Sequence, residues 1–162
     1  MVQMGTTILK RKKGKRPMNV ITTLTERRRE KQWNFEKKML RHISMKEMEK
    51  AIKEWMFPIL PFQFQAYPFL IDQCLDMTID AYLLGTEFGR FGYYGEPAQE
   101  ARKRCEEELT DLSHCLCATL TGWSKEERAP TEALLAASDM LIGTWWEKGF
   151  REASKAYKLR LH

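Results

Sequence analysis

The chain has 162 residues with 27 Lys and Arg against 22 Asp and Glu, but six of the basic residues lie within residues 1–17. From Met18 onward, 21 basic residues face 22 acidic ones, so the formal charge of +5 does not indicate a nucleic-acid or membrane-surface protein. The length, 43% hydrophobic residues and 11% aromatics predict one folded domain and exclude a disordered chain. Because it lacks a long apolar run and a signal-peptide pattern, we expect a cytoplasmic protein without a membrane span.

Residues 1–17 show no apolar periodicity and end in the basic sequence KRKKGKRP. One interpretation is a disordered basic tail. The other is that the segment lies upstream of a true start at Met18, because a purine-rich ribosome-binding stretch read as codons yields Lys, Gly and Arg. Under both interpretations we expect a helical domain over residues 18–162.

The next segment contains two helix-start signals. Thr23 with Glu26 and Ser44 with Glu47 have the spacing of a capping box, which predicts one helix to about residue 41 and another that stops at Pro58. The second helix should present a single apolar face, formed by Met45, Met48, Ile52 and Trp55.

Residues 55–71, WMFPILPFQFQAYPFLI, contain no charged residue. Their three prolines exclude a continuous helix. We favour a buried connector that crosses one end of the core, and an exposed hydrophobic docking surface is the alternative.

The most buried helix is predicted at residues 69–88. Apolar residues cover most of its circumference and leave a narrow polar arc, which holds Asp72, Asp76, Asp80 and Glu87. Pro97 suits the start of a further helix that ends near Gly122, and a last long helix begins at about Thr131. The predicted fold is all-α, a single compact bundle of about five helices with the helix near 69–88 at its centre.

The sequence FGRFGYYGEP at residues 88–97 interleaves glycines with aromatic residues. We expect a tight turn in which a glycine ends one helix, the aromatic rings fold onto the core and Glu96 caps the next helix. A carboxylate at that helix start disfavours a phosphate-binding loop. The alternative is a pocket for a small molecule or a partner, formed by Arg90, Phe91, Tyr93, Tyr94 and Glu96.

Acidic residues recur at helical spacing on two predicted helices. Asp111 and His114 have a spacing similar to the Glu-x-x-His pairs of di-iron bundles, but a full site needs a second pair, which the sequence lacks. We therefore favour solvated acidic faces and expect no cofactor. The alternative is a metal site formed by Asp76, Asp80, Asp111 and His114.

Two segments, AYLLGTEFGRFGYYGE at residues 81–96 and WWEKGF at residues 145–150, resemble the YbaK-type family of Bacillus and its relatives. The resemblance extends from about Trp33 to Lys158. This family is classed as a domain of unknown function and is distinct from the aminoacyl-tRNA editing enzymes of similar name. The resemblance therefore implies a small cytoplasmic protein of spore-forming bacteria and supplies no catalytic residues.

These observations favour a non-enzymatic protein-interaction or regulatory module, with another protein as its partner at the 88–97 loop or the 55–71 segment. The sequence contains no nucleophile paired with a base and no cofactor fingerprint, and nothing in it indicates an oligomeric state. One alternative is a small-molecule or metal-dependent enzyme that uses the 88–97 loop and the acidic helix faces. A second is nucleic-acid binding through the basic N-terminal region, which Glu26 and Glu30 disfavour by diluting the cluster Arg27, Arg28, Arg29 and Lys31.

Overall fold

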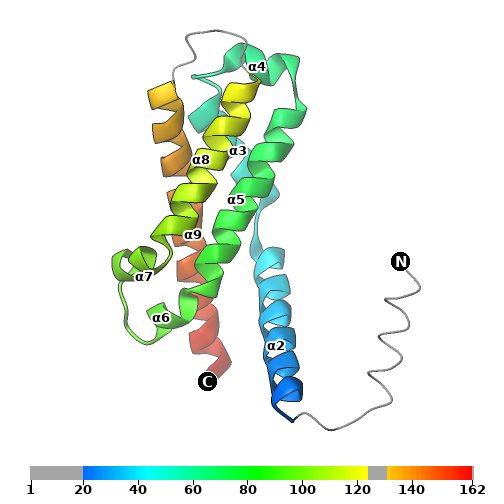
Figure 1. Ribbon diagram of the computed structural model, residues 1–162, viewed down its shortest axis with the longest axis vertical. Coiled ribbons are helices and arrows are strands. Elements are labelled where there is room, and N and C mark those ends of the chain that lie inside the picture. Colours follow the sequence, from blue (N-terminus) through cyan, green and yellow to red (C-terminus); the bar gives the residue numbers. More distant parts are fainter. Residues whose placement is uncertain (1–19, 124–130, 162) are drawn as a thin grey trace, which may run out of the picture. The chain divides into compact units, whose positions relative to one another are not determined.

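The structure is a computed structural model that describes residues 20–123 and 131–161, with side chains over 24–123 and 131–159. The basic segment 1–17 lies outside these ranges. The described elements are α2 (Val20–His42), α3 (Met45–Met56), α4 (Pro61–Ala66), α5 (Phe69–Glu87), α6 (Gly89–Tyr93), α7 (Ala98–Arg104), α8 (Glu106–Gly122) and α9 (Thr131–Leu161) (Figure 1). The chain divides into two compact units, residues 1–37 and 38–162, so the boundary falls within α2. All further contacts described below lie within the second unit.

The all-α prediction is confirmed, but eight helices in the described ranges replace the expected five or so. Two short helices, α4 and α6, form where a connector and a loop were expected. In addition, the helix predicted from Pro97 to Gly122 is interrupted at Cys105, whose φ of −123° and ψ of 26° separate α7 from α8. None of the described helices combines the length and the apolar character that crossing a membrane requires.

The helix-start signals were only partly correct. The backbone N–H of Glu47 donates to Ser44 Oγ at 3.3 Å, so the predicted cap of α3 is confirmed. The cap at Thr23 is wrong, because α2 begins at Val20 and Thr23 lies inside it. The buried face of α3 is also rotated from the expected one: Met56 is buried on it, whereas Trp55 is 38% exposed.

The predicted buried helix is confirmed as α5, which packs against α9 along much of its length. Figure 1 shows α5, α8 and α9 side by side. The carboxylates of the predicted polar arc are exposed. The fully covered positions of α5 form a stripe rather than most of its circumference, and they are Leu70, Cys74, Thr78, Ala81, Tyr82, Gly85 and Thr86.

Glycines allow α5 and α6 to approach α9 at backbone distance. A Cβ added to Gly85 would overlap the carbonyl oxygen of Trp146, and a Cβ added to Gly149 would overlap the carbonyl oxygen of Tyr82. The contact is therefore reciprocal. Gly89 and Gly92 continue the same face into α6, where an added Cβ would overlap side chains of α9. Glycine suits these positions because it has no side chain to hold the two backbones apart.

Two hydroxyl groups add polar contacts to this apolar interface. The Tyr82 hydroxyl donates to Glu152 Oε1 at 2.6 Å. Burial and then the bond to this carboxylate raise the pKa of Tyr82, so its hydroxyl remains protonated. Ser154 Oγ lies 2.8 Å from the carbonyl oxygens of both Gly89 and Phe150, which fixes the start of α6 on α9.

We expect Gly85→Ala and Gly149→Ala each to lower the free energy of unfolding by about 1–3 kcal/mol, because the added methyl group meets a backbone carbonyl that cannot rotate away. Urea denaturation followed by circular dichroism measures this difference. Gly122→Ala is the matched control, since among the described residues nothing beyond its chain neighbours and its own helix backbone lies within 4 Å of the added Cβ. Equal effects at all three positions would contradict the steric explanation.

Candidate functional site

The aromatic and glycine-rich segment is largely used for internal packing. The expectation that a glycine ends the preceding helix in a loop is wrong, because Gly89–Tyr93 forms α6 directly after Phe88. The turn glycine is Gly95, whose φ is +98°. Glu96 does not cap α7, whose N-cap is Pro97 without a side-chain hydrogen bond.

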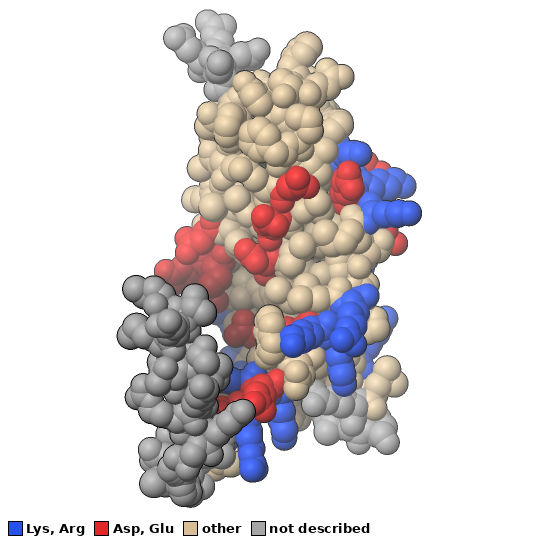
Figure 2. Space-filling view, turned by 90° about the vertical axis from the view of Figure 1, so that its right-hand side faces the viewer, with Lys and Arg blue, Asp and Glu red and all other residues tan. Residues whose placement is uncertain are grey.

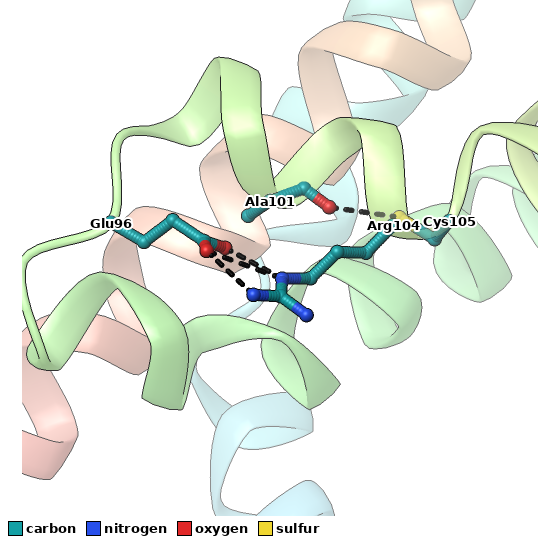
Figure 3. Close-up of polar contacts among 4 residues, drawn as sticks. All are labelled: Glu96, Ala101, Arg104 and Cys105. Atoms are coloured by element: carbon teal, nitrogen blue, oxygen red, sulfur yellow. Dashed lines mark hydrogen bonds and ion pairs between the residues drawn. The ribbon is translucent and has the colours of Figure 1, made fainter.

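Glu96 instead forms a bidentate ion pair with Arg104, the last residue of α7 (Figure 3). The Arg104 Nε and Nη2 atoms donate to the two carboxylate oxygens at 2.9 and 2.8 Å. The guanidinium carbon of Arg104 also lies 4.3 Å from the centroid of the Phe91 ring. The pair therefore closes the turn and covers one aromatic side chain, and Arg104 lowers the pKa of Glu96.

The five predicted partner-binding residues thus separate into two groups. Phe91 and Glu96 are engaged within the protein, and Tyr93 is half-buried with its ring 5.0 Å from that of Tyr94. Arg90 is exposed, and Tyr94 is 80% exposed. None of the five lines either of the grooves described next.

Two of the four predicted metal ligands share a shallow groove between α5 and α8. Asp80 and Asp111 line this groove of about 420 Å³ together with Glu108 and Cys115, whereas Asp76 and His114 do not. Burial and then the negative charge of Asp76 raise the pKa of Asp80. Within the described ranges, no three His, Cys, Asp or Glu side chains are arranged so that they could hold a metal ion.

The sequence did not indicate a second groove, which lies between α7, α8 and α9. Its volume is about 490 Å³, within the usual range for small-molecule sites. It exists because the chain bends at Cys105, and no proline or glycine marks that bend. Its lining residues are Gln99, Arg102, Lys103, Glu106, Leu109, Thr110, Ser113, Asp139, Ile142 and Gly143.

An aromatic cluster lies at the other end of α8. Trp123, which directly follows α8, is 39% exposed. Its ring centroid lies 5.1 Å from that of Tyr67 and 4.9 Å from that of Phe69. Phe62 on α4 is 74% exposed. We call Phe62, Tyr67, Phe69 and Trp123 the aromatic end surface.

Residues 55–71 supply most of this surface. They have features of both predicted alternatives, the buried connector and the exposed docking surface. Met56, Leu60 and Phe64 are buried, as expected of a connector. Phe62 and Phe69 are exposed, as expected of a docking surface. The local spacing of apolar residues could have indicated this two-sided arrangement, whereas the contribution of Trp123 depends on the tertiary fold.

The four thiols should differ strongly in reactivity. Burial raises the pKa of Cys74 to about 12 and that of Cys105 to about 11, and it also raises the pKa of Cys117. Only Cys115 is exposed. We expect iodoacetamide at neutral pH to modify one thiol of the native protein rapidly, because buried thiols are both inaccessible and protonated.

Mass spectrometry of the alkylated protein measures this reaction. Cys115→Ser should abolish the rapid phase, and Cys117→Ser, two residues away on the same helix, should leave it unchanged. Rapid modification of more than one thiol would show that the core opens more readily than this packing implies.

The ion pair predicts a titration shift at Glu96. In Arg104→Gln the pKa of Glu96 should rise toward its ordinary value, because the favourable partner of the carboxylate is lost. In the native protein the depressed pKa means that the stabilisation from this pair is complete above the unfolded-state pKa. It is lost as the pH falls through the folded-state value.

Carboxyl-carbon NMR shifts of Glu96 recorded against pH measure this change. Lys103→Gln is the control, because Lys103 pairs with Glu100 at 3.5 Å and not with Glu96. An unchanged Glu96 titration in Arg104→Gln would contradict the assignment of the pair.

Comparison with known proteins places the chain in a family. Residues 18–162 match the family described as "Protein of unknown function (DUF2521)". The chain is 31% identical over 146 residues to the "Uncharacterized protein YbaK" of Bacillus subtilis (strain 168), an alignment that covers 89% of this chain and 99% of that relative. No solved structure gives a significant match. The resemblance carried by residues 81–96 and 145–150 is therefore confirmed, and the chain belongs to the YbaK-type DUF2521 family.

Proposed function

We propose that the protein is a non-enzymatic interaction module, whose partner is another protein that docks on the aromatic end surface. The observation that carries this proposal is the exposure of Phe69 and Trp123, whose ring centroids lie 4.9 Å apart, together with the exposure of Phe62 in the same charge-free segment 55–71 as Phe69. Contiguous exposed aromatic residues are unusual on the surfaces of monomeric proteins and are typical of interaction sites.

Buried neighbouring residues hold the rings of this surface in place. Leu60, Phe64 and Leu70 are buried, and they anchor the segments on either side of Tyr67. The ring of Phe69 packs edge-on against that of Trp123, with an interplanar angle of 76°. Aromatic side chains that are fixed before binding lose little conformational entropy on association, which is why such residues dominate binding hot spots.

The charge distribution supports a protein partner over nucleic acid or a lipid surface. Residues 55–71 contain neither Lys nor Arg, and both phosphate backbones and anionic lipid headgroups are recognised mainly through such cations. In Figure 2 the end that carries α4 shows no charged side chains on the visible face outside the grey atoms. The surface complementary to the aromatic end surface is an apolar patch on another protein.

A second docking position on the same module is the tip of the aromatic and glycine-rich segment. Tyr94 is the most exposed large hydrophobic residue among those described, at 80%, and exposed Arg90 lies on the same segment. Tyr and Arg are both enriched at protein interfaces. This position is a useful comparison. Glu96 and Phe91 are engaged with Arg104 inside the protein, whereas most of the Tyr94 side chain is exposed to a partner.

Photo-crosslinking in cells that naturally produce the protein tests the proposal. A benzophenone amino acid is placed at Phe62, at Tyr94 or at Met140, an exposed apolar position on α9 that serves as control. We expect an adduct with a discrete second protein from position 62 and none from position 140.

The pattern of adducts separates the possible outcomes. Adducts from position 94 alone would move the partner to the glycine-rich segment. Adducts of the protein with itself would show that the partner is a second copy of the chain and not a different protein. The absence of adducts from positions 62 and 94 would contradict the proposal.

A further inference from the structure

We propose that the groove between α7, α8 and α9 binds a small zwitterion of the amino-acid type, with a carboxylate, an ammonium group and an apolar side chain. This site lies apart from the aromatic end surface and does not depend on the proposed function. It is carried by one positioned guanidinium group, by the balance of charges around the groove and by the apolar character of its floor.

Arg102 is positioned by packing rather than by an ion pair. Its guanidinium lies directly against Gly143, where an added Cβ would overlap Nη2, and its Cζ atom lies 5.9 Å from the ring centroid of buried Trp146. Within the described part of the chain, no carboxylate lies at ion-pair distance from Arg102. By contrast, Arg104 is bound in bidentate fashion by Glu96.

A guanidinium held in this way is suited to an anionic group of a ligand. Its planar set of N–H donors matches the two oxygens of a carboxylate, and such charge-assisted pairs are among the strongest hydrogen bonds in proteins. Lys103 lines the same groove, but its ammonium group pairs with Glu100 at 3.5 Å. Thr110 and Ser113 add hydroxyl groups, and Ser113 is only 3% exposed although it lines the groove.

Two carboxylates also line the groove, Glu106 at the start of α8 and Asp139 on α9. Because Lys103 already pairs with Glu100, Arg102 is the lining cation left for a ligand, and the groove offers no net positive charge to a polyanion such as a nucleotide. A ligand that carries one positive and one negative group satisfies both sides.

The floor of the groove is apolar. Leu109 and Ile142 line it and are almost fully buried, so they offer an aliphatic contact beneath the charged groups. Small-molecule sites commonly combine such a floor with a few polar groups that fix orientation. This combination favours an amino acid with an aliphatic side chain over a small hydrophilic one.

Isothermal titration calorimetry of the full chain with three organic probes and inorganic phosphate tests the inference. L-leucine carries both charges, 4-methylpentanoate lacks the ammonium group, and isopentylamine lacks the carboxylate. We expect L-leucine to bind, and each of the other two to bind at least about tenfold more weakly. Inorganic phosphate is the fourth probe and should not compete with L-leucine.

Two variants assign the charges to their partners. Arg102→Gln should weaken L-leucine and 4-methylpentanoate by about tenfold or more and leave isopentylamine unchanged, because only the anion partner is lost. Asp139→Asn should weaken L-leucine and isopentylamine and leave 4-methylpentanoate unchanged, because only the partner of the ammonium group is lost. Lys155→Gln, an exposed position on α9 outside the groove, is the matched control.

Thermal unfolding of each variant shows whether it is folded, and the opposite selectivities of the two variants distinguish loss of a contact from general damage. Absence of L-leucine binding to the native chain would overturn the inference. Equal binding of all three organic probes, effective competition by phosphate, or an equal effect of Lys155→Gln would also overturn it. None of these outcomes bears on crosslinking at Phe62.

Discussion

The second unit of this protein depends on one steric condition, the direct approach of the α5 and α6 backbones to α9. Gly85 and Gly149 each leave room for a carbonyl group of the opposite helix, so neither position accepts a side chain without displacement of backbone. The large side chains next to these glycines can then pack tightly around the contact. Trp146, for example, is fully buried and stacks on Phe150 at a centroid distance of 5.2 Å.

This condition also explains the two segments that carry the family resemblance. Residues 81–96 and 145–150 are far apart in the sequence, but their glycines and aromatic residues form the two sides of a single interface. What looked like a candidate binding loop is therefore largely a packing element. The surfaces left for binding lie elsewhere, at the aromatic end surface and at the groove beside α7.

Local sequence signals predicted those parts of the fold that local chemistry decides. The long apolar helices were placed almost correctly, and Ser44 and Pro58 mark real limits of α3. The glycines at 89 and 92 were assigned to a loop because, in isolation, glycine disfavours helix. Their contacts with α9 reverse that preference, and only the tertiary structure contains those contacts.

The candidate sites were harder to predict for the same reason. The groove requires the bend at Cys105 and places residues from three helices together, among them Arg102 and Asp139. The exposed half of residues 55–71 was anticipated as an alternative, whereas the ring of Trp123 joins it only through folding. Of the predicted metal ligands, Asp80 and Asp111 do meet in one groove, because α5 and α8 pack side by side.

The reciprocal glycine contact also restricts how the second unit can move. If α9 slid past α5 by one residue, Lys148 or Phe150 would replace Gly149 opposite the carbonyl group of Tyr82, and no space for either side chain exists there. The two helices thus have one permitted register, and sliding or rotation of one against the other is blocked. A conformational change that moves α5 against α9 would first have to separate the two backbones at these glycines.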